Sequence, residues 1–359
     1  MIKTVENELR VVVGITQGDI NGISYEVILK SLSDNRLLEL FVPVLYGSNR
    51  IASYYKKMMN IPEFGFHIVK SADQIHAKKA NLINLHDNEV KVDVGDSTAI
   101  AGEQSLLSLN TALADLQNGK IDVLVTSPLN KKNVQQSIQG NFSGHTGYLA
   151  QKMNCTDYLM LMVTDNIRIG VATEHISIEN VPSTLTVELL SSKIRTMEHS
   201  LKKDFRIRKP KIAVLGLNPH AGDNGLIGRE EQEKIIPAIE KAQNQGTLAF
   251  GPYSADGFFA SQQYKEFDAV LAMYHDQGMI PFKLMAFENG VNFTAGLPFV
   301  RTSPAHGTAY DIAGKDLASP DSMRAAMYLA VDIYNNRKMW DEINKSPLGS
   351  LNIEKENHD

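Results

Sequence analysis

The segment VVVGITQGDINGISYEVILK (Val11–Lys30) joins a run of Val and Ile to a glycine-containing loop and a helical pattern. The apolar run has no polar alternation, which is typical of a strand covered on both faces. A strand that leads through a short loop into a helix is the repeating unit of an α/β fold. Gly14, Gly18 and Gly22 match neither the G-x-G-x-x-G dinucleotide fingerprint nor a Walker A loop. The loop is therefore either a tight turn that needs flexible backbone or, with Asp19, the lining of a ligand cleft at the strand's carboxyl end.

The same alternation continues outward along the chain. We expect strands at Arg10–Ile15, Phe41–Tyr46, Ala80–Leu85, Ile121–Thr126, Tyr158–Val163, Arg168–Ala172, Lys211–Leu217 and Phe267–Ala272. We expect helices at Gly102–Gln117, Thr186–Lys202, Gly228–Gln243 and Pro320–Lys338. This order indicates an α/β fold with a mostly parallel sheet. No linker rich in Pro, Gly or Ser divides the chain, so two domains would have to pack closely with a cleft between them.

Composition narrows the class of protein. The length of 359 residues suggests about two domains. With 36 basic and 41 acidic residues the net charge is -5, which argues against nucleic acid or an anionic membrane as the main partner. The single cysteine, Cys155, excludes an intrachain disulfide and a zinc site built from cysteines. The charged N-terminus has no apolar signal region and no apolar run is long enough to span a membrane, so we expect a cytoplasmic protein.

Three histidines follow apolar strand runs: His175 in IGVATEHIS, His220 in LGLNPHAGD and His275 in VLAMYHDQG. The carboxyl ends of parallel strands meet at one edge of a sheet, so the three imidazoles are expected to converge there. Three neutral imidazoles with open positions form the ligand set of a catalytic zinc-like site. Any one of these histidines, taken alone, is more often structural or a hydrogen-bond donor. The spacing is not H-E-x-x-H, so the prediction rests on the three strand ends together.

Two further segments contain groups suited to an anion. Gly144-His145-Thr146 precedes a short helical pattern, where His and Thr either bind a phosphate at the helix start or serve as a cap and a surface histidine. Asn292 and Arg301 flank an apolar turn, and Arg301 either contacts a phosphate or carboxylate in bidentate fashion or forms a surface salt bridge. The pair Glu230–Glu231 at a helix start is interpreted as compensation of the helix dipole.

Taken together, several motifs resemble the 4-hydroxythreonine-4-phosphate dehydrogenase (PdxA) family of pyridoxal 5′-phosphate biosynthesis, from about Val11 to Met327. The motifs are Gly18-Asp19…Gly22, Thr126-x-Pro128…Lys131, Gly144-His145-Thr146, Leu217-Asn218-Pro219-His220-Ala221-Gly222, Met273-Tyr274-His275-Asp276-Gln277-Gly278 and Arg301-Thr302-Ser303-x-x-His306-Gly307-Thr308-Ala309. The stretch His306–Pro320 also resembles the adenine-side NAD loop of the isopropylmalate dehydrogenase fold.

The resemblance implies two α/β/α domains of the isocitrate/isopropylmalate dehydrogenase-like type, with the active site in the interdomain cleft. On this basis we expect a first domain of residues 1–128 plus about 300–345, a second domain of residues 129–299 with dimer contacts, and a polar tail of residues 346–359. It also implies a homodimer whose active site lies at the subunit interface.

The resemblance further assigns roles to individual residues. The metal ligands would be His175, His220 and His275, with one subunit's set completed by its partner. The preferred metal would be zinc, and cobalt, nickel or magnesium are the alternatives. The substrate contacts would be His145, Thr146, Lys283, Asn292 and Arg301, and the NAD or NADP contacts His306, Gly307, Thr308, Ala309 and Asp311. The general base would be His145 or Asp256, although Asp256 could equally be a helix N-cap.

The implied reaction is oxidation of the secondary alcohol of 4-phosphooxy-L-threonine by NAD(P), followed by loss of carbon dioxide to give 3-amino-2-oxopropyl phosphate. Two departures from the family pattern bear on the substrate: Ile20-Asn21 stands where Pro-Ala is usual, and Gly147 stands where an acidic residue is usual. They leave open a related dehydrogenase that acts on a threonate or erythronate 4-phosphate. The remaining alternatives are a metal-dependent phosphatase or isomerase and a module that only binds a phosphosugar.

Overall fold

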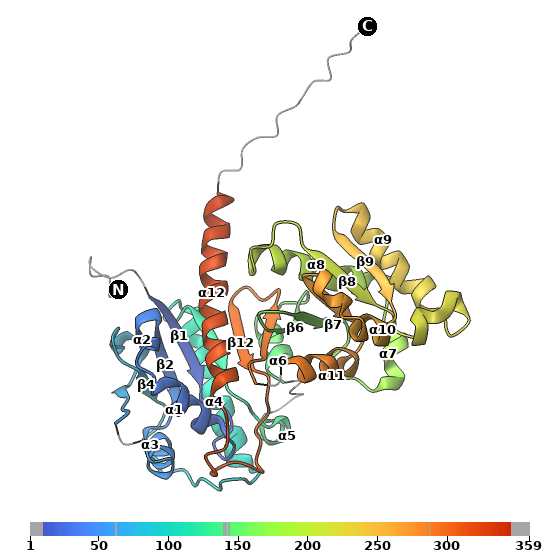
Figure 1. The fold of residues 1–359 in the computed structure, drawn as a ribbon. Helices are drawn as coiled ribbons and strands as arrows, with labels where there is room; N and C mark the ends of the chain where they lie inside the picture. Colours follow the sequence, from blue (N-terminus) through green and yellow to red (C-terminus); the bar gives the residue numbers. More distant parts are fainter. Residues whose placement is uncertain (1–9, 62, 139–141, 143, 287, 346–359) are drawn as a thin grey trace.

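The computed structural model of the chain describes residues 10–345 except 62, 139–141, 143 and 287. Its centre is one twelve-stranded sheet with the order β3-β4-β2-β1-β5-β12-β11-β6-β7-β10-β8-β9 (Figure 1). The strands are β1 Val11–Thr16, β2 Phe41–Gly47, β3 His67–Val69, β4 Asn81–Asn84, β5 Val123–Thr126, β6 Leu159–Val163, β7 Arg168–Val171, β8 Lys211–Leu215, β9 Leu248–Tyr253, β10 Ala269–Ala272, β11 Val291–Ala295 and β12 Val300–Pro304.

The sheet is mostly parallel, as predicted, and its antiparallel pairs lie in the middle. From β3 to β12 all neighbours run parallel, and so do β7, β10, β8 and β9. The pairs β12–β11, β11–β6 and β6–β7 are antiparallel. The sheet is thus continuous through its centre, and the expected division into domains at residues 128 and 300 stays a prediction.

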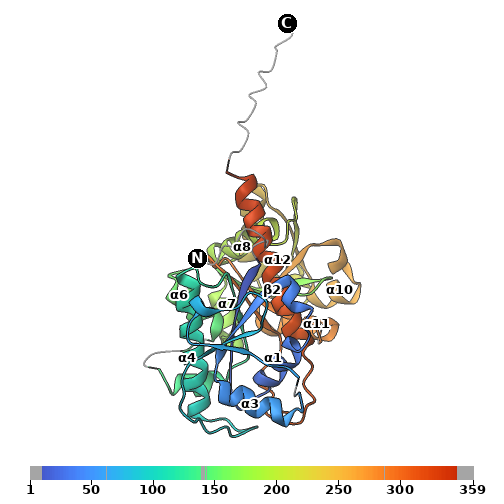
Figure 2. The same ribbon diagram turned by 90° about the vertical axis from the view of Figure 1, so that its left-hand side faces the viewer.

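Helices cover both faces of the sheet (Figures 1 and 2). The α-helices are α1 Ser24–Leu32, α2 Leu37–Leu40, α3 Asn49–Met58, α4 Ala99–Gln117, α5 Lys131–Gln135, α6 His145–Lys152, α7 Val181–Thr184, α8 Val187–Lys203, α9 Ile236–Asn244, α10 Ala255–Ala260, α11 His275–Ala286 and α12 Asp321–Ile343. Short helical turns occur at Ala72–Gln74, Ile178–Asn180, Pro219–Gly225, Glu231–Ile235 and Gln263–Glu266. None of the described helices is long and apolar enough to cross a lipid bilayer.

The apolar core differs between the two faces. On one face, a single cluster runs under α1, α12, α8 and α9 and includes Val125, Phe293 and Leu161 from the central strands. On the other face there are two clusters, one under α4 and α6 and one under α10 and α11. Side chains alternate along a strand, so the residues directly before and after Phe293 in β11 face the second side of the sheet. Polar residues there separate the two clusters and form the floor of the site described below.

The expected strands and helices are present, with shifted ends. The helix expected from Gly228 begins at Glu231 with a π-helical turn and continues as α9. The strands β3, β9, β11 and β12 and the helix α11 were not predicted. Asn292 and Thr294 in β11, and three consecutive polar residues from Arg301 to Ser303 in β12, break the apolar runs by which strands were recognised. Helix α11 contains Pro281, which is unusual inside a helix. The apolar turn between Asn292 and Arg301 is the connection of the β11–β12 hairpin.

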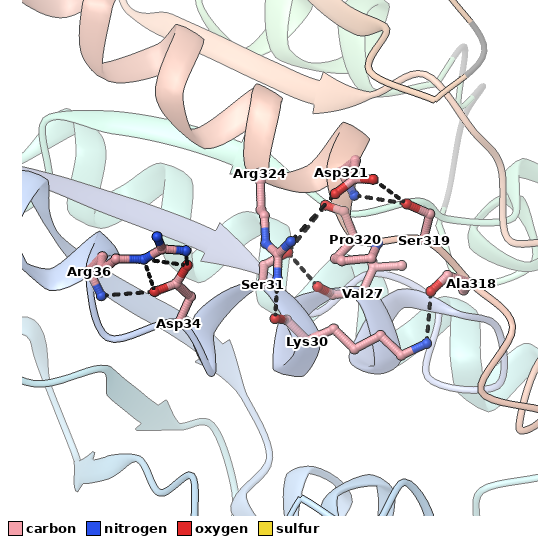
Figure 3. A network of polar contacts seen from close by, with 10 residues as sticks. All are labelled: Val27, Lys30, Ser31, Asp34, Arg36, Ala318, Ser319, Pro320, Asp321 and Arg324. Atoms are coloured by element: carbon pink, nitrogen blue, oxygen red, sulfur yellow. Dashed lines mark hydrogen bonds and ion pairs between the residues drawn. The ribbon is translucent and has the colours of Figure 1, made fainter.

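Helix α12 connects distant parts of the chain. At its start Arg324 donates to the Lys30 backbone oxygen at 2.9 Å, and the Lys30 ammonium donates to the Ala318 oxygen at 2.8 Å (Figure 3). At its other end Arg337 Nε donates to the carboxylate of Asp204, after α8, at 2.6 Å. Asp204 is only 2% exposed and also accepts from the Ser200 hydroxyl, so this ion pair is buried and well satisfied.

We expect Asp204→Ala to lower the free energy of unfolding by roughly 3–5 kcal/mol, because it leaves the Arg337 guanidinium half-buried and unpaired. Denaturant unfolding measures this change. The matched control is Asp341→Ala in the same helix, which breaks a more exposed ion pair with Lys203 of α8. This change should lower the free energy of unfolding by no more than about 1 kcal/mol. Equal losses in the two variants would contradict the assignment.

Candidate active site

A cavity of about 290 Å³ opens on the face with the divided core, over β12, β11 and β6 and between α6 and α11. It brings together nine of the predicted site residues: His145, Thr146, His175, His275, Lys283, Asn292, Arg301, His306 and Gly307. Its other described lining residues include Thr126, Lys131, Met160, Met162, Glu174, Met279 and Ser303. The residues come from segments far apart in the sequence, and the central strand order is what places them side by side.

Arg301 forms the floor of the cavity. Its side chain rises from β12 and is 2% exposed, which excludes the surface salt bridge that the sequence left open. Its guanidinium donates only to hydroxyl groups: Nη2 to Thr126 at 2.7 Å and to Ser303 at 3.0 Å, and Nη1 to Thr294 at 3.2 Å. No carboxylate among the described residues forms an ion pair with it. Burial lowers the pKa of Arg301 to about 9, although the charge of Glu174 in the same cavity opposes this effect, so the group is charged at neutral pH and forms no ion pair.

The start of α6 forms one wall. Gly144 precedes the helix with φ +99, and a Cβ there would lie 2.8 Å from Lys131 Cε, so glycine allows the lysine to pass close to the helix start. The hydroxyl of Thr146 lies 3.5 Å from Arg301 Nη1. Burial, and then the charges of Arg301 and Lys131, hold the pKa of His145 well below its usual range. His145 is therefore neutral at physiological pH.

The opposite wall is built from the ends of β7 and β10, which are parallel neighbours. Thr173 donates backbone and side-chain hydrogen bonds to the Met273 oxygen, which holds the two strand ends together. The rings of His175 and His275 consequently lie 5.5 Å apart between centroids. Burial lowers the pKa of His175 to about 4, so its ring is neutral at pH 7. The expected convergence is thus present for two of the three strand-end histidines.

His220 and Asp256 lie outside this cavity. His220 follows β8, and a run of left-handed backbone from His220 to Asn224 carries it to an exposed position. Asp256 is exposed in the first turn of α10, whose N-cap is Ser254. Its pKa is lowered mainly by the Ser254 hydroxyl and the Gly257 backbone, and to a smaller extent by the nearby His220. Within the described residues of a single chain, no group of three His, Cys, Asp or Glu side chains is placed to hold a metal ion.

The left-handed loop is held by Glu231. This carboxylate is 2% exposed and accepts the backbone N–H groups of Leu217 and Asn218, both at 2.7 Å. A Cβ at Gly222 would lie 2.5 Å from Glu231 Oε2. Glu231 lies in the first helical turn, as the interpretation of helix-dipole compensation requires, and it has a second role that the sequence did not reveal, as the buried acceptor for the loop that carries His220.

The predicted cofactor segment is divided between the cavity and the interior. His306 and Gly307 line the cavity, and His306 Nε2 is buried without a hydrogen-bond partner among the described residues. Thr308, Ala309 and Asp311 lie outside the cavity lining. Their segment packs on the β1–α1 loop: Ile23 N–H donates to the Thr308 oxygen at 3.0 Å.

Asp19 supports this contact and does not line the cavity. It is fully buried and accepts the Tyr310 hydroxyl at 2.7 Å, while burial raises its pKa. A Cβ at Gly22 would lie 2.6 Å from the Thr308 oxygen, so close backbone approach explains this glycine. Of the two readings of the loop, the structure favours the tight turn.

Two charged lining residues, Lys131 and Glu174, were not predicted as site residues. Lys131 lies within a motif that carried the family resemblance, yet no role was given to it. Glu174 directly precedes His175, and its place at a strand end was the available signal. Burial raises the pKa of Glu174, while Lys193, Lys131 and Arg301 lower it.

Comparison with known proteins identifies the family to which the chain belongs. The family model for the pyridoxal phosphate biosynthetic protein PdxA matches residues 39–330. A 4-hydroxythreonine-4-phosphate dehydrogenase from Bacteroides thetaiotaomicron is 47% identical over 351 residues, which cover 98% of this chain and 95% of the relative. A protein from Oceanobacillus iheyensis described as "Putative D-threonate 4-phosphate dehydrogenase" is 35% identical, covering 90% of this chain and 97% of the relative.

Solved structures give the same result. The crystal structure of 4-hydroxythreonine-4-phosphate dehydrogenase from Klebsiella pneumoniae matches with a TM-score of 0.79 and 34% identity, covering 92% of this chain and 99% of that one. An isocitrate dehydrogenase from Methylococcus capsulatus, with a TM-score of 0.50 and 14% identity over 93% of this chain and 88% of that one, shares the fold alone. The predicted fold class, α/β of the isocitrate/isopropylmalate dehydrogenase-like type, is confirmed. The chain therefore belongs to the PdxA family of pyridoxal phosphate biosynthetic proteins.

Proposed function

We propose that the protein is a 4-hydroxythreonine-4-phosphate dehydrogenase that oxidises the secondary alcohol of 4-phosphooxy-L-threonine with NAD or NADP. The resulting β-keto acid loses carbon dioxide and leaves 3-amino-2-oxopropyl phosphate. Family membership supports the reaction, and the buried Arg301 without an acidic partner supports an anionic substrate in this cavity. Membership of a dehydrogenase family also disfavours a metal-dependent phosphatase, an isomerase or a module that only binds a phosphosugar.

The anionic groups of the substrate would be held by the floor and the start of α6. Arg301 has a planar array of donors that suits phosphate or carboxylate oxygens, and the hydroxyls around it keep that plane fixed. The N-terminal end of α6 adds backbone donors and the positive end of its dipole. Lys131 and Lys283 add charge at the cavity wall. Binding energy from these remote groups orients the reacting carbon.

His145 is the proposed base within the same chain. A neutral ring at the cavity wall can accept the proton that the alcohol loses on oxidation. Asn292 would help to orient the substrate, because its side-chain oxygen is buried and has no partner among the described residues. Asp256 of the partner subunit remains the alternative base.

The residues present fit a nicotinamide cofactor, which supplies the hydride acceptor when bound. The unpartnered Nε2 of His306 and the side-chain-free surface of Gly307 lie at the cavity, where a polar planar group can dock. Thr308, Ala309 and Asp311 would extend this contact beyond the cavity.

The residues also fit a divalent metal, with zinc first and cobalt or magnesium as alternatives. His175 and His275 offer two neutral imidazoles side by side, and we propose that His220 of the partner subunit is the third ligand. When bound, such a metal supplies Lewis-acid chemistry that lowers the pKa of an alcohol and polarises a ketone.

A homodimer with its active site at the subunit interface agrees with the surface near these histidines. Large apolar side chains are exposed close in sequence to each of them: Ile176 and Ile178 after His175, Leu226 and Ile227 after His220, and Ile280 and Leu284 after His275. Leu226 and Leu284 are 81% and 83% exposed. Apolar surface of this kind commonly marks a protein–protein contact. We further propose that the enzyme acts in the cytoplasm, in keeping with its single cysteine.

The function is tested with purified protein, 4-phosphooxy-L-threonine, NAD or NADP and a buffer of defined metal content. We expect absorbance of reduced cofactor to grow together with 3-amino-2-oxopropyl phosphate. A chelator should abolish the activity, and zinc or cobalt should restore it. Oxidation of a threonate or erythronate 4-phosphate at a higher kcat/KM than the amino acid would instead support the alternative substrate.

Arg301→Lys tests the anion site. We expect kcat/KM for the phosphorylated substrate to fall by roughly 30- to 1000-fold, mostly through KM, because an ammonium cannot reproduce the planar contacts of the guanidinium. The KM for the nicotinamide cofactor should change little. If only cofactor binding weakens, Arg301 belongs to the dinucleotide site and the assignment is wrong.

The shared metal set is tested by subunit complementation. His175→Ala and His220→Ala should each be inactive as homodimers. A mixed dimer, isolated with two different tags after co-expression, should regain about half of the wild-type activity and metal content, because one of its two equivalent sites is then intact. An inactive mixed dimer that is folded and dimeric would contradict a set shared between subunits.

A further inference from the structure

Glu174 is a carboxylate in the cavity wall to which the reaction described above assigns nothing. It lies after β7, between Thr173, whose hydrogen bonds to the Met273 oxygen fix the backbone, and His175. Its side chain is 18% exposed, and it lines the cavity. Within the described residues its one contact with a basic group is His175 Nδ1 at 3.9 Å, too long for a hydrogen bond. The position of the carboxylate is therefore fixed by the backbone, its side chain is largely buried, and no described residue forms a close ion pair with its charge.

The cavity as a whole has an uneven charge. Its described lining contains three permanently basic side chains, Lys131, Lys283 and Arg301, but a single acidic one, Glu174. Helix α6 adds no carboxylate at its start, because residue 147 is glycine. Lys193, Lys131 and Arg301 attract this carboxylate, but among the described residues none of them forms an ion pair with it. Burying a carboxylate without a paired cation is costly, so a site that evolved only to bind anions would gain from a neutral side chain here.

This pattern matches the charges of one substrate class. A phosphorylated 2-amino acid has two anionic groups, the phosphate and the carboxylate, and one ammonium group. A phosphorylated 2-hydroxy acid has the same two anions and no cation. We infer that Glu174 is a specificity-determining residue that binds the substrate ammonium and so selects a phosphorylated amino acid over the corresponding hydroxy acid. This inference rests on the proposed function and names the group that decides between its two substrates.

The competing explanation is that Glu174 positions His175. A carboxylate beside a metal-binding imidazole commonly orients the ring. The two explanations differ in what they predict. Loss of an ammonium partner affects only a substrate that has an ammonium group, whereas loss of a positioning group weakens metal binding and affects every substrate alike.

The test compares wild type, Glu174→Gln and the control Glu179→Gln, an exposed acid in the short helical turn after His175. Each dimer is assayed with 4-phosphooxy-L-threonine and with the threonate 4-phosphate that has a hydroxyl in place of the amine. For Glu174→Gln we expect KM for the amino acid to rise about 10- to 100-fold, with kcat nearly unchanged. The kcat/KM for the hydroxy acid and the affinity for Zn²⁺ should stay within about threefold of wild type, as should all values for Glu179→Gln.

Each result has a separate meaning. Wild type that oxidises neither compound would overturn the proposed function itself. Wild type that oxidises the amino acid, with equal losses for both substrates or no loss in Glu174→Gln, would overturn the inference alone. If Glu174→Gln does not fold, two other measurements test the inference. Glu174→Asp should keep the preference for the amino acid. Wild type should bind the 2-deamino analogue more weakly than the amino acid. Equal affinity of wild type for the two ligands would also overturn the inference.

Discussion

A buried guanidinium without a carboxylate is the constraint on which the centre of this protein depends. Taking such a charge out of water costs several kcal/mol even after relaxation. Among the described residues, only hydroxyl groups accept its hydrogen bonds: those of β5, β11 and β12 and, at 3.5 Å, that of Thr146 in α6. These hydroxyls lie on one face of the sheet, where they interrupt the apolar core and separate the cluster under α4 and α6 from the cluster under α10 and α11. The cavity exists because the core cannot close over Arg301.

The opposite face shows how the protein tolerates this interruption. There the core is one continuous cluster under α1, α12, α8 and α9. Helix α12 is bound at its start to α1 (Figure 3) and at its far end to Asp204, and it packs on the central strands β1, β5, β12 and β11. A rigid helix on one face allows the other face to remain polar and open, which is what a site that must exchange substrate and product requires.

In the loop after β8, an unfavourable backbone conformation is likewise offset by hydrogen bonds to a buried group. Non-glycine residues in left-handed backbone cost about 1–3 kcal/mol each, and His220, Ala221, Asp223 and Asn224 all adopt it. The buried carboxylate of Glu231 offsets part of this cost by accepting two backbone N–H groups. The result is a histidine held at the surface, away from the other two histidines of its own chain. A histidine in this position can act if the loop presents it to the active site of a second subunit. The proposed site therefore needs two copies of the chain.

The sequence by itself determined the α/β class, most of the parallel strands and nine of the residues that line the cavity, because buried parallel strands are apolar runs and because strand ends and family motifs mark functional side chains. It could not reveal β11 and β12, whose polar positions look like loop until the sheet shows that Asn292, Arg301 and Ser303 line the cavity while Thr302 donates to α12 on the other face. Nor could it show that Arg301 lacks an acid, that Glu231 is buried under a loop, or that His220 lies apart from His175 and His275. Those facts depend on which strands are neighbours and on how a loop turns in three dimensions. Only the tertiary structure decides them, because spacing along a chain does not determine distance across a sheet.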